Sequence, residues 1–240
     1  MTTVDYVLGI DLGTSGVKAL VAELPVARVL AACHARYGYV LKDGGRAEQS
    51  TRSLLTATLS VVRDAIRAAG IPGTRIAAIG LSGQMHGTVL YDKNDAVLGN
   101  IITWEDQRAS RALLDEFRAI AGATVYRSGC GLATGYCAAT LFALKRHDRA
   151  MYRRVKRFVL PVDWVRRELT GGALCTDASN GSSSGLFDTR RRTWNTALMR
   201  RIGFDSQIVP EVKESFEVGG RIASRIARLT GLTEGVPVTV

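Results

Sequence analysis

The chain has 240 residues, of which 46% are hydrophobic, 22% charged and 7% aromatic, a composition that supports a hydrophobic core and excludes disordered, collagen-like and coiled-coil proteins. Its apolar runs are far shorter than the roughly 20 residues of a membrane helix, and its first residues lack the pattern of a signal peptide, so we expect a cytoplasmic protein. Lys and Arg outnumber Asp and Glu by 32 to 22, a formal net charge of +10, which raises the question of a polyanionic partner.

The first hundred residues predict strands and one long helix. Apolar runs at 4–10, 17–23 and 29–34 predict three strands, the first two joined by a Gly-rich turn. A helical apolar pattern follows Ser50 and ends near Gly70, as is typical of a capped amphipathic helix. The continuous apolar run 76–81 then predicts a fully buried strand in a central parallel position. Shorter strands are expected at 88–91 and 101–104.

The second part of the chain predicts mainly helices. One helix is expected to begin near Asp106, and the others are expected at 138–147, 162–169 and 196–202. The small polar segment 179–184 is expected to be a loop. Leading strands followed by alternating helices and strands predict an α/β fold, with a mixed sheet covered by helices on both faces. The last six residues begin a further strand, so we expect the chain to be one half of a larger protein.

The cysteines and histidines predict no metal site. Cys33, Cys130, Cys137 and Cys175 form no CxxC pair, and the three histidines are scattered, so we expect reduced and mostly buried thiols. The basic run 145–157 is typical of a solvated helix face, and the scarcity of aromatic residues around it argues against a nucleic-acid surface.

Residues 9–18 predict a phosphate-binding hairpin. They match neither the dinucleotide fingerprint nor the P-loop, and they lead into a strand where both of those motifs lead into a helix. Glycines that can take positive φ would let backbone N–H groups and two hydroxyls face one phosphate. The residues concerned are Gly13, Thr14, Ser15 and Gly16. Asp11 can hold Mg²⁺ through water, as phosphoryl transfer requires. The alternative is a simple Asp-Gly hairpin turn.

Two further segments predict a sugar site. Gln84, Met85 and His86 lie between glycines just past a strand end, where α/β sheets bind ligands. Gln84 and His86 can hydrogen-bond hydroxyls, and Met85 offers an adaptable apolar wall. Trp104 and Asp106 combine an aromatic plane with a carboxylate, a pairing that suits the stacking and chelation of a sugar. The alternatives are a buried histidine satisfied by backbone, and a core tryptophan followed by a helix N-cap.

Taken in order, these segments resemble the N-terminal domain of the FGGY carbohydrate kinases, and among them the kinases of sedoheptulose and then of xylulose. The resemblance runs the length of the chain and includes the segments 9–15, 82–87, 102–108, 133–140, 176–180, 185–188 and 231–238. It implies an RNase H-like domain of the actin-like ATPase superfamily. Residues 1–240 would form the sugar-binding lobe, and the C-terminal nucleotide-binding lobe would be absent from this chain.

The resemblance also implies ATP-dependent phosphorylation of a ketose, with Mg²⁺. Asp11 matches the family's catalytic, metal-associated aspartate. The family's phosphate-facing hairpin corresponds here to Gly13, Thr14 and Ser15. The family's sugar-contacting positions correspond in this sequence to Gln84, Met85, His86, Trp104, Asp106 and Tyr136. Met85 and His86 stand where glycerol kinases carry Arg and Glu, which favours sedoheptulose or a pentulose such as xylulose or ribulose.

The family's catalytic-base aspartate and nucleotide lobe lie beyond the segments matched here, so we expect negligible turnover from this chain alone. One alternative is a non-catalytic sugar-binding lobe that acts as a sensor or pairs with a separate second lobe. Another is a polyanion-binding module that uses the run 145–157 together with Arg190, Arg191 and Arg192. We expect neither a membrane nor a nucleic-acid partner, and the question of a homo-oligomer stays open.

Overall fold

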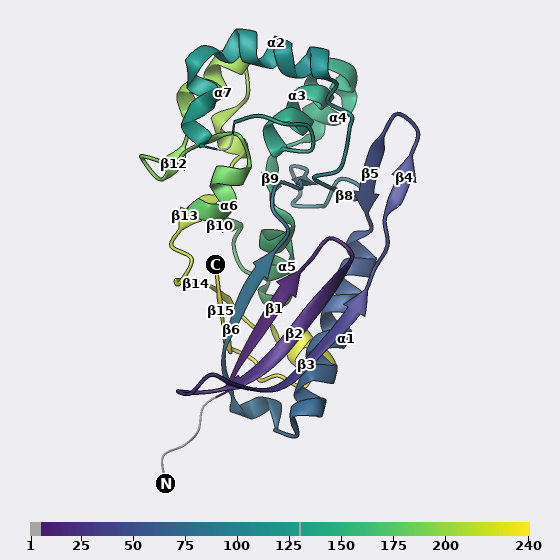
Figure 1. Ribbon diagram of the computed structural model, residues 1–240, viewed down its shortest axis with the longest axis vertical. Helices are drawn as coiled ribbons and strands as arrows, with labels where there is room; N and C mark the ends of the chain where they lie inside the picture. Colours follow the sequence, from purple (N-terminus) through teal and green to yellow (C-terminus); the bar gives the residue numbers. More distant parts are fainter. Residues whose placement is uncertain (1–5, 130) are drawn as a thin grey trace.

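A six-stranded mixed sheet forms the centre of the computed structural model, which describes residues 6–129 and 131–240 (Figure 1). The strands lie in the order β14-β15-β6-β1-β2-β3. Their bounds are β1 (Tyr6–Leu12), β2 (Gly16–Glu23), β3 (Arg28–Arg36), β6 (Ile76–Gly83), β14 (Val218–Arg221) and β15 (Pro237–Thr239). β1, β2 and β3 form an antiparallel meander, whereas β6 runs parallel to both β1 and β15. The α/β class and the mixed sheet are therefore confirmed.

Helices cover only one face of this sheet in the described part of the chain. α1 (Thr51–Ala69), α5 (Pro161–Thr170) and α8 (Ser224–Thr230) share one hydrophobic core with Leu8 and Ile10 of β1. Figure 1 shows the sheet in front of α1. The expected helices on the second face are not present among the described residues, which is a correction to the predicted covering.

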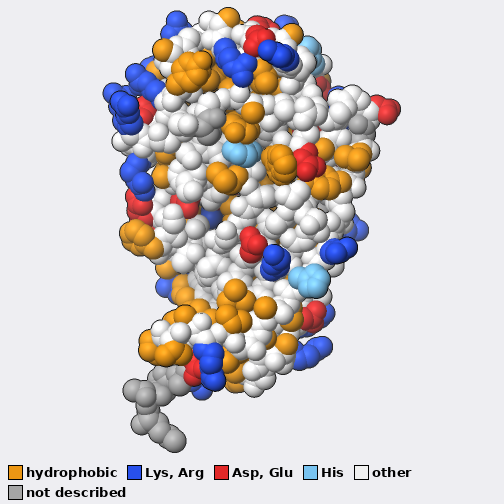
Figure 2. Space-filling model, in the orientation of Figure 1, with side chains coloured by type: hydrophobic (Ala, Val, Ile, Leu, Met, Phe, Trp, Pro, Cys, Tyr) orange, Lys and Arg blue, Asp and Glu red, His pale blue; other side chains and the backbone are white. Residues whose placement is uncertain are grey.

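The open face carries a broad groove of about 820 Å³. Gly9, Asp11, Lys18, Leu20 and Gly80 line it, and the Leu20 side chain is 38% exposed. Figure 2 shows this face toward the viewer, with hydrophobic side chains on the surface over the lower part of the sheet. The prediction of a fully buried β6 is therefore wrong, because Ala77 and Gly80 are exposed on the strand.

A second hydrophobic core lies beyond one end of the sheet, and Figure 1 shows its helices gathered at the end of the molecule away from the N-terminus. Phe117 and Phe142 meet edge to face in this core, with ring centroids 5.2 Å apart. Its elements are α2 (Arg111–Ala121), the 3-10 helix η2 (Gly122–Ser128), α3 (Cys137–His147), α4 (Arg149–Arg154), β9 (Arg157–Val159), α6 (Ala178–Ser183), β11 (Phe187–Asp188), β12 (Thr193–Trp194), α7 (Thr196–Ile202) and η3 (Ser206–Ile208).

Short elements join the two cores. β5 pairs with both β4 and β8, β7 pairs with β9, and β10 pairs with β13. Their bounds are β4 (Val40–Lys42), β5 (Arg46–Gln49), η1 (Gly73–Arg75), β7 (Val89–Tyr91), β8 (Ile101–Ile102), β10 (Cys175–Asp177) and β13 (Glu211–Lys213). None of the helices in the described residues combines the length and hydropathy that a bilayer crossing needs.

The helix boundaries follow their capping residues. Ser50 caps α1 by accepting a hydrogen bond from the Ser53 amide, and Gly70 ends the helix with a left-handed φ of 66°. α2 begins at Arg111 and not near Asp106, because Ser110 is its cap. α3, α5 and α7 confirm the other predicted helices.

The polar segment 179–184, predicted to be a loop, contributes most of the short helix α6. Asp177 caps this helix through the Asn180 amide. The Ser182 and Ser183 hydroxyls donate to carbonyls three residues earlier, at 2.6 and 2.7 Å. Local side-chain hydrogen bonds thus hold a helix that hydrophobic periodicity does not reveal.

The basic run and the thiols agree with the sequence-based expectations where they are described. α4, inside the run 145–157, has no buried residue. Cys137 and Cys175 are free and buried, and Cys33 is free and partly buried, while Cys130 lies outside the described residues. In the described part of the chain, no group of three or more His, Cys, Asp or Glu side chains is arranged to hold a metal ion.

Candidate active site

The predicted phosphate and sugar segments begin at the same edge of the sheet. Strands β1 and β6 are parallel neighbours, with Asp11 opposite Ser82 and Leu12 opposite Gly83. The backbone N–H of Gln84 then donates to the Leu12 carbonyl at 2.7 Å. The hairpin that follows β1 and the turn that follows β6 therefore lie side by side.

The hairpin of residues 13–15 is held through its carbonyl groups. The Tyr37 hydroxyl donates to the Gly13 carbonyl, and the Tyr37 amide donates to the Ser15 carbonyl at 3.3 Å. The Gln49 side chain donates to the Thr14 carbonyl at 2.5 Å. The amide N–H groups of these three hairpin residues have no acceptor within the described part of the chain. They are therefore free to bind an anion such as a phosphate.

Close packing, and not positive φ, explains the two hairpin glycines. Gly13 and Gly16 are not among the residues with positive φ, so that expectation is wrong. A Cβ on Gly13 would lie 3.2 Å from the Gly16 carbonyl oxygen, and one on Gly16 would lie 2.6 Å from the Ala35 carbonyl oxygen. A larger residue at Gly16 would push β3 away from the hairpin.

Asp11 lies at the end of β1 on the open face of the sheet. Its side chain is exposed, and its carboxylate has no hydrogen-bond or ion-pair partner among the described residues. A single free carboxylate beside an anion-binding hairpin fits Mg²⁺, which takes one or two carboxylates and fills its other positions with water and substrate phosphates. Asp11 would thus hold a metal that arrives with a nucleotide.

A direct contact joins the hairpin to the predicted sugar wall, a name used here for Gln84, Met85, His86, Trp104 and Tyr136. The Trp104 indole N–H donates to the Thr14 hydroxyl at 3.2 Å, and the Trp104 side chain is 43% exposed. The side-chain Nε2 of Gln84 donates to the side-chain Oε1 of Gln49 at 2.9 Å, and Gln49 in turn donates to the hairpin carbonyl of Thr14. Met85 follows Gln84 with its side chain 45% exposed. The structure thus brings these predicted site residues together.

His86 is held in one orientation by two contacts. Its ring stacks on Tyr136, with centroids 3.9 Å apart and planes 4° apart. Its Nδ1 lies 2.7 Å from the Ser183 carbonyl oxygen, which can only accept, so Nδ1 carries a proton and Nε2 of the neutral ring is an acceptor. His86 also has a φ of 72°, in the left-handed region that few non-glycine residues adopt, and the Ser183 hydroxyl accepts from its backbone amide at 3.3 Å.

Comparisons with known proteins decide the family. The model of the FGGY family of carbohydrate kinases, N-terminal domain, matches residues 6–240. The chain belongs to this family. A xylulose kinase of Bacillus subtilis is 28% identical over 97% of this chain and 46% of its own length. A glycerol kinase of Gloeobacter violaceus is 32% identical over 88% of this chain and 42% of its own length.

Two solved structures of sugar kinases have the same fold. The xylulose kinase from Rhodospirillum rubrum matches with a TM-score of 0.89 and 26% identity, over 98% of this chain and 48% of that one. The gluconate kinase from Lactobacillus acidophilus matches with a TM-score of 0.90 at 22% identity, over 98% and 47% of the two chains, and shows the fold alone. This FGGY domain spans about half the length of the curated relatives it matches.

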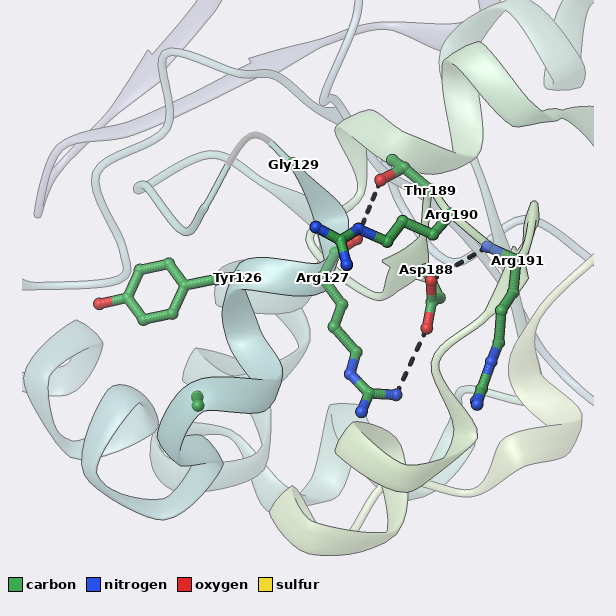
Figure 3. A pocket seen from close by; sticks show the side chains of 8 residues that line it. Tyr126, Arg127, Gly129, Asp188, Thr189, Arg190 and Arg191 are labelled. Carbon is green, nitrogen blue, oxygen red and sulfur yellow. Dashed lines mark hydrogen bonds and ion pairs between the residues drawn. The ribbon is translucent and has the colours of Figure 1, made fainter.

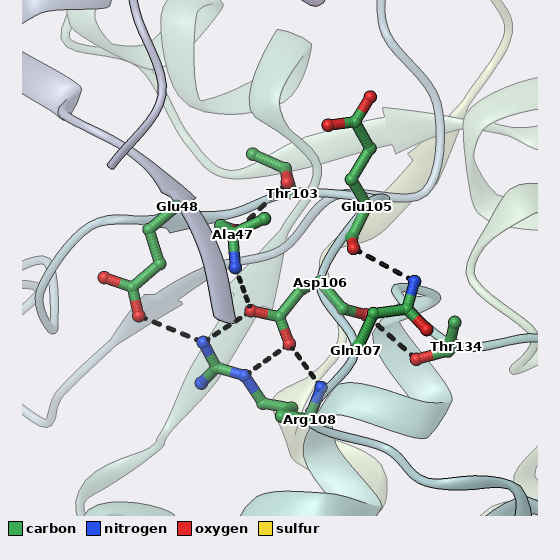
Figure 4. A network of polar contacts seen from close by, with 8 residues as sticks. All are labelled: Ala47, Glu48, Thr103, Glu105, Asp106, Gln107, Arg108 and Thr134. Carbon is green, nitrogen blue, oxygen red and sulfur yellow. Dashed lines mark hydrogen bonds and ion pairs between the residues drawn. The ribbon is translucent and has the colours of Figure 1, made fainter. Parts of the chain in front are cut away.

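Asp106 has a structural place in this FGGY domain, which corrects the predicted sugar contact (Figure 4). Its side chain is fully buried. Its Oδ2 accepts from the Ala47 amide, and both its oxygens accept from the Arg108 guanidinium at 2.7 and 2.9 Å. Arg108 also donates to Glu48 at 3.0 Å. Burial alone would lower the Arg108 pKa, but the two carboxylates raise it. Asp106 therefore fixes the Trp104 loop to β5.

Sequence reasoning missed several residues that position the site. Tyr37, Gln49 and Ser183 hold the hairpin and His86 across 24 to 97 residues of chain, so no local pattern identifies them. Gly135 lies within the segment 133–140, directly before the predicted sugar contact Tyr136, and has a φ of 76°. A glycine at this position was the one sequence feature that could have predicted a left-handed residue beside the site.

Gly135→Ala is expected to weaken sugar binding by roughly tenfold to a hundredfold. A Cβ at this position would lie 1.9 Å from the Trp104 carbonyl oxygen, so Trp104 and the adjacent Tyr136 must both move. Isothermal titration with xylulose measures the affinity. Gly99→Ala is the matched control, because Gly99 has a φ of 81° but no atom within 4 Å of its added Cβ. Equal affinities in the two variants would contradict this positioning role.

Proposed function

We propose that this chain is the sugar-binding half of a kinase that transfers a phosphoryl group from ATP to a hydroxyl of a ketose. The contact between the Trp104 indole and the Thr14 hydroxyl carries the proposal. It joins an exposed aromatic wall, suited to a sugar, to a hairpin whose free N–H groups suit a phosphate. Phosphoryl transfer depends on this proximity of donor and acceptor.

Each residue of the site has a role in the proposed reaction. Asp11 would hold the Mg²⁺ that accompanies ATP, and this ion would neutralise charge on the transferring phosphoryl group. The phosphate contacts would come from Gly13, Thr14 and Ser15. The sugar would contact Gln84, Met85, His86, Trp104 and Tyr136. His86 Nε2 would accept a hydrogen bond from a sugar hydroxyl, because its Nδ1 proton is committed to Ser183.

We favour a five-carbon ketose as the acceptor. Curated relatives from Bacillus subtilis, Staphylococcus xylosus and Haemophilus influenzae are named xylulose kinase, although a glycerol kinase is also among the similar proteins. Met85 supplies an apolar surface and His86 a hydrogen-bonding group, a combination that suits a polyol with an apolar edge. Sedoheptulose and ribulose are the competitors that a binding assay must compare with xylulose.

A second domain is the proposed partner of the open sheet face. The face carries Asp11 together with apolar surface at Leu20, so a domain packed there would bury the apolar surface and enclose the metal site. The curated relatives are about twice as long as the matched chain. The nucleotide contacts and the general base would come from that domain, so the 240-residue chain alone would show no turnover.

Trp104→Ala is expected to lower xylulose affinity by about tenfold, because stacking of the sugar on the exposed indole is lost. Isothermal titration of the 240-residue chain with xylulose, ribulose, sedoheptulose and glycerol measures both the affinity and the preference. The fold should persist, since the side chain is 43% exposed. Phe216→Ala is the matched control, with an aromatic side chain that is 80% exposed and lies outside the site.

Two results would separate the parts of this proposal. If no ketose binds, or if Trp104→Ala binds as tightly as the parent chain, the sugar site is wrong. If a ketose binds but the protein with both halves releases no ADP, the chain is a sugar-binding lobe without kinase activity.

A further inference from the structure

A separate cavity of about 500 Å³ lies in the helical part of the chain (Figure 3). It shares no lining residue with the hairpin or the sugar wall. η2 and the residue after it contribute one side of the cavity, and the loop between β11 and β12 contributes the other. The side chains shown in Figure 3 include Tyr126, Arg127, Asp188, Thr189, Arg190 and Arg191.

Positive charge at this cavity is only partly compensated. Asp188 is its single carboxylate, and Asp188 Oδ2 lies 3.4 Å from the Arg127 guanidinium. Arg190 and Arg191 have no ion-pair partner within the described residues, whereas Arg192 beside them pairs with Glu214 at 2.5 Å. Two exposed arginines that line the cavity therefore have no counter-charge among the described residues, and this excess of positive charge favours the binding of an anion.

The backbone that carries these arginines is fixed before any ligand binds. Phe187 and Trp194 anchor the two strands, with their rings edge to face at 5.4 Å. The Thr189 amide and hydroxyl both donate to the Arg127 carbonyl, at 3.0 and 3.1 Å. The Asp188 carboxylate accepts from the Arg191 amide at 3.1 Å. Because the loop is ordered before a ligand arrives, little of the binding free energy is spent on ordering it.

We propose that this cavity binds a small phosphorylated molecule. Guanidinium groups match phosphate oxygens through paired hydrogen bonds, which makes phosphate the anion that this set of side chains suits best. The cavity volume lies in the range typical of small-molecule sites. A nucleic acid would need an extended basic track with stacking aromatics, but these arginines line one cavity beside a single exposed aromatic side chain, Tyr126.

Titration of the 240-residue chain with pyrophosphate tests this site. We expect saturable binding that Arg190→Ser/Arg191→Ser weakens by about tenfold to a hundredfold, since each lost guanidinium removes charge-assisted hydrogen bonds. Arg52→Ser/Arg225→Ser is the control, because it removes the same charge from exposed positions on α1 and α8. The control is expected to bind within about twofold of the parent chain.

Three results would overturn the proposal. One is unchanged pyrophosphate affinity in Arg190→Ser/Arg191→Ser, which would place the anion at the hairpin or elsewhere. Another is an equal loss in the control variant, which would show an effect of net charge alone. The third is tighter binding of a single-stranded oligonucleotide that the same double substitution removes, which would make the occupant a nucleic acid.

Discussion

Asp11→Asn is expected to lower kcat of the kinase that carries both halves by about a hundredfold to a thousandfold. The substitution keeps the shape of the side chain and removes the negative charge that would hold Mg²⁺ beside the hairpin. Asp11 is exposed and has no partner among the described residues, so the fold should tolerate the change. ADP release with a saturating ketose measures the effect.

Sugar binding supplies the second readout for Asp11. Asp11 lies on the open sheet face, whereas the sugar wall lies beyond the ends of β1 and β6, so Asp11→Asn should leave ketose affinity unchanged in the 240-residue chain. Asp115→Asn is the matched control, with a carboxylate that is 61% exposed on α2. Normal turnover in Asp11→Asn would show that the metal-binding role is wrong, and a parallel loss of sugar affinity would place Asp11 in the sugar pocket.

Elements with local signals were predictable from the sequence. The start of α1 at Ser50, its end at Gly70 and the bounds of α7 all depend on capping residues and on apolar periodicity within a few residues. α2 shows where such signals become ambiguous, because both Asp106 and Ser110 are good N-cap residues. The choice between them depends on Arg108 and the Ala47 amide, which occupy the Asp106 carboxylate.

The uncovered face of the sheet was harder to predict. In β1 the sequence shows the alternation of apolar and polar residues that a strand with one open face requires, because Leu8 and Ile10 are buried while Asp11 is exposed. In β6 the exposed positions are occupied by Ala77 and Gly80, which are small and apolar, so the strand has the composition of a fully buried one. Composition alone cannot separate a strand buried on both faces from one whose open face is apolar.

The candidate site was predictable as a set of residues but not as a geometry. Gln84, His86 and Trp104 were identified by their position near strand ends and by their chemistry. Their orientation depends on Gln49 and Ser183, which are 35 and 97 residues away from Gln84 and His86. Hydrogen bonds over such separations leave no periodic trace in the sequence, so the structure was needed to identify the residues that position the site.

Arg166→Met is expected to cost about 3–5 kcal/mol of unfolding free energy at neutral pH. The Arg166 and Asp163 side chains are 1% and 0% exposed, and Arg166 Nη2 lies 3.2 Å from Asp163 Oδ1. Arg166 Nη2 also donates to the Cys175 carbonyl. Without the guanidinium, the buried Asp163 carboxylate has no counter-charge. Urea denaturation measures the loss, and Arg118→Met, which breaks an exposed ion pair with Asp115, should cost less than about 1 kcal/mol.

The pH dependence of this loss distinguishes an unpaired carboxylate from a simple packing defect. Burial raises the pKa of Asp163 from 3.8 to about 6, even though Arg166 lowers it. In Arg166→Met the guanidinium no longer lowers the pKa of Asp163, so this pKa in the folded state lies still further above its value in the unfolded state. The folded state then holds a proton that the unfolded state releases, and the unfolding free energy falls as pH rises from about 4 through the folded pKa.

We therefore expect the cost of Arg166→Met to be smaller at pH 5 than at pH 8. Asp163→Leu/Arg166→Met should recover most of the loss at both pH values, because replacing a whole buried pair with apolar side chains is often neutral or stabilising. A cost that is the same at pH 5 and pH 8, and that the double substitution does not relieve, would mean that Arg166 stabilises the fold by filling space between α5 and β14. In that case its charge, and the carboxylate beside it, would have little influence on the stability of this core.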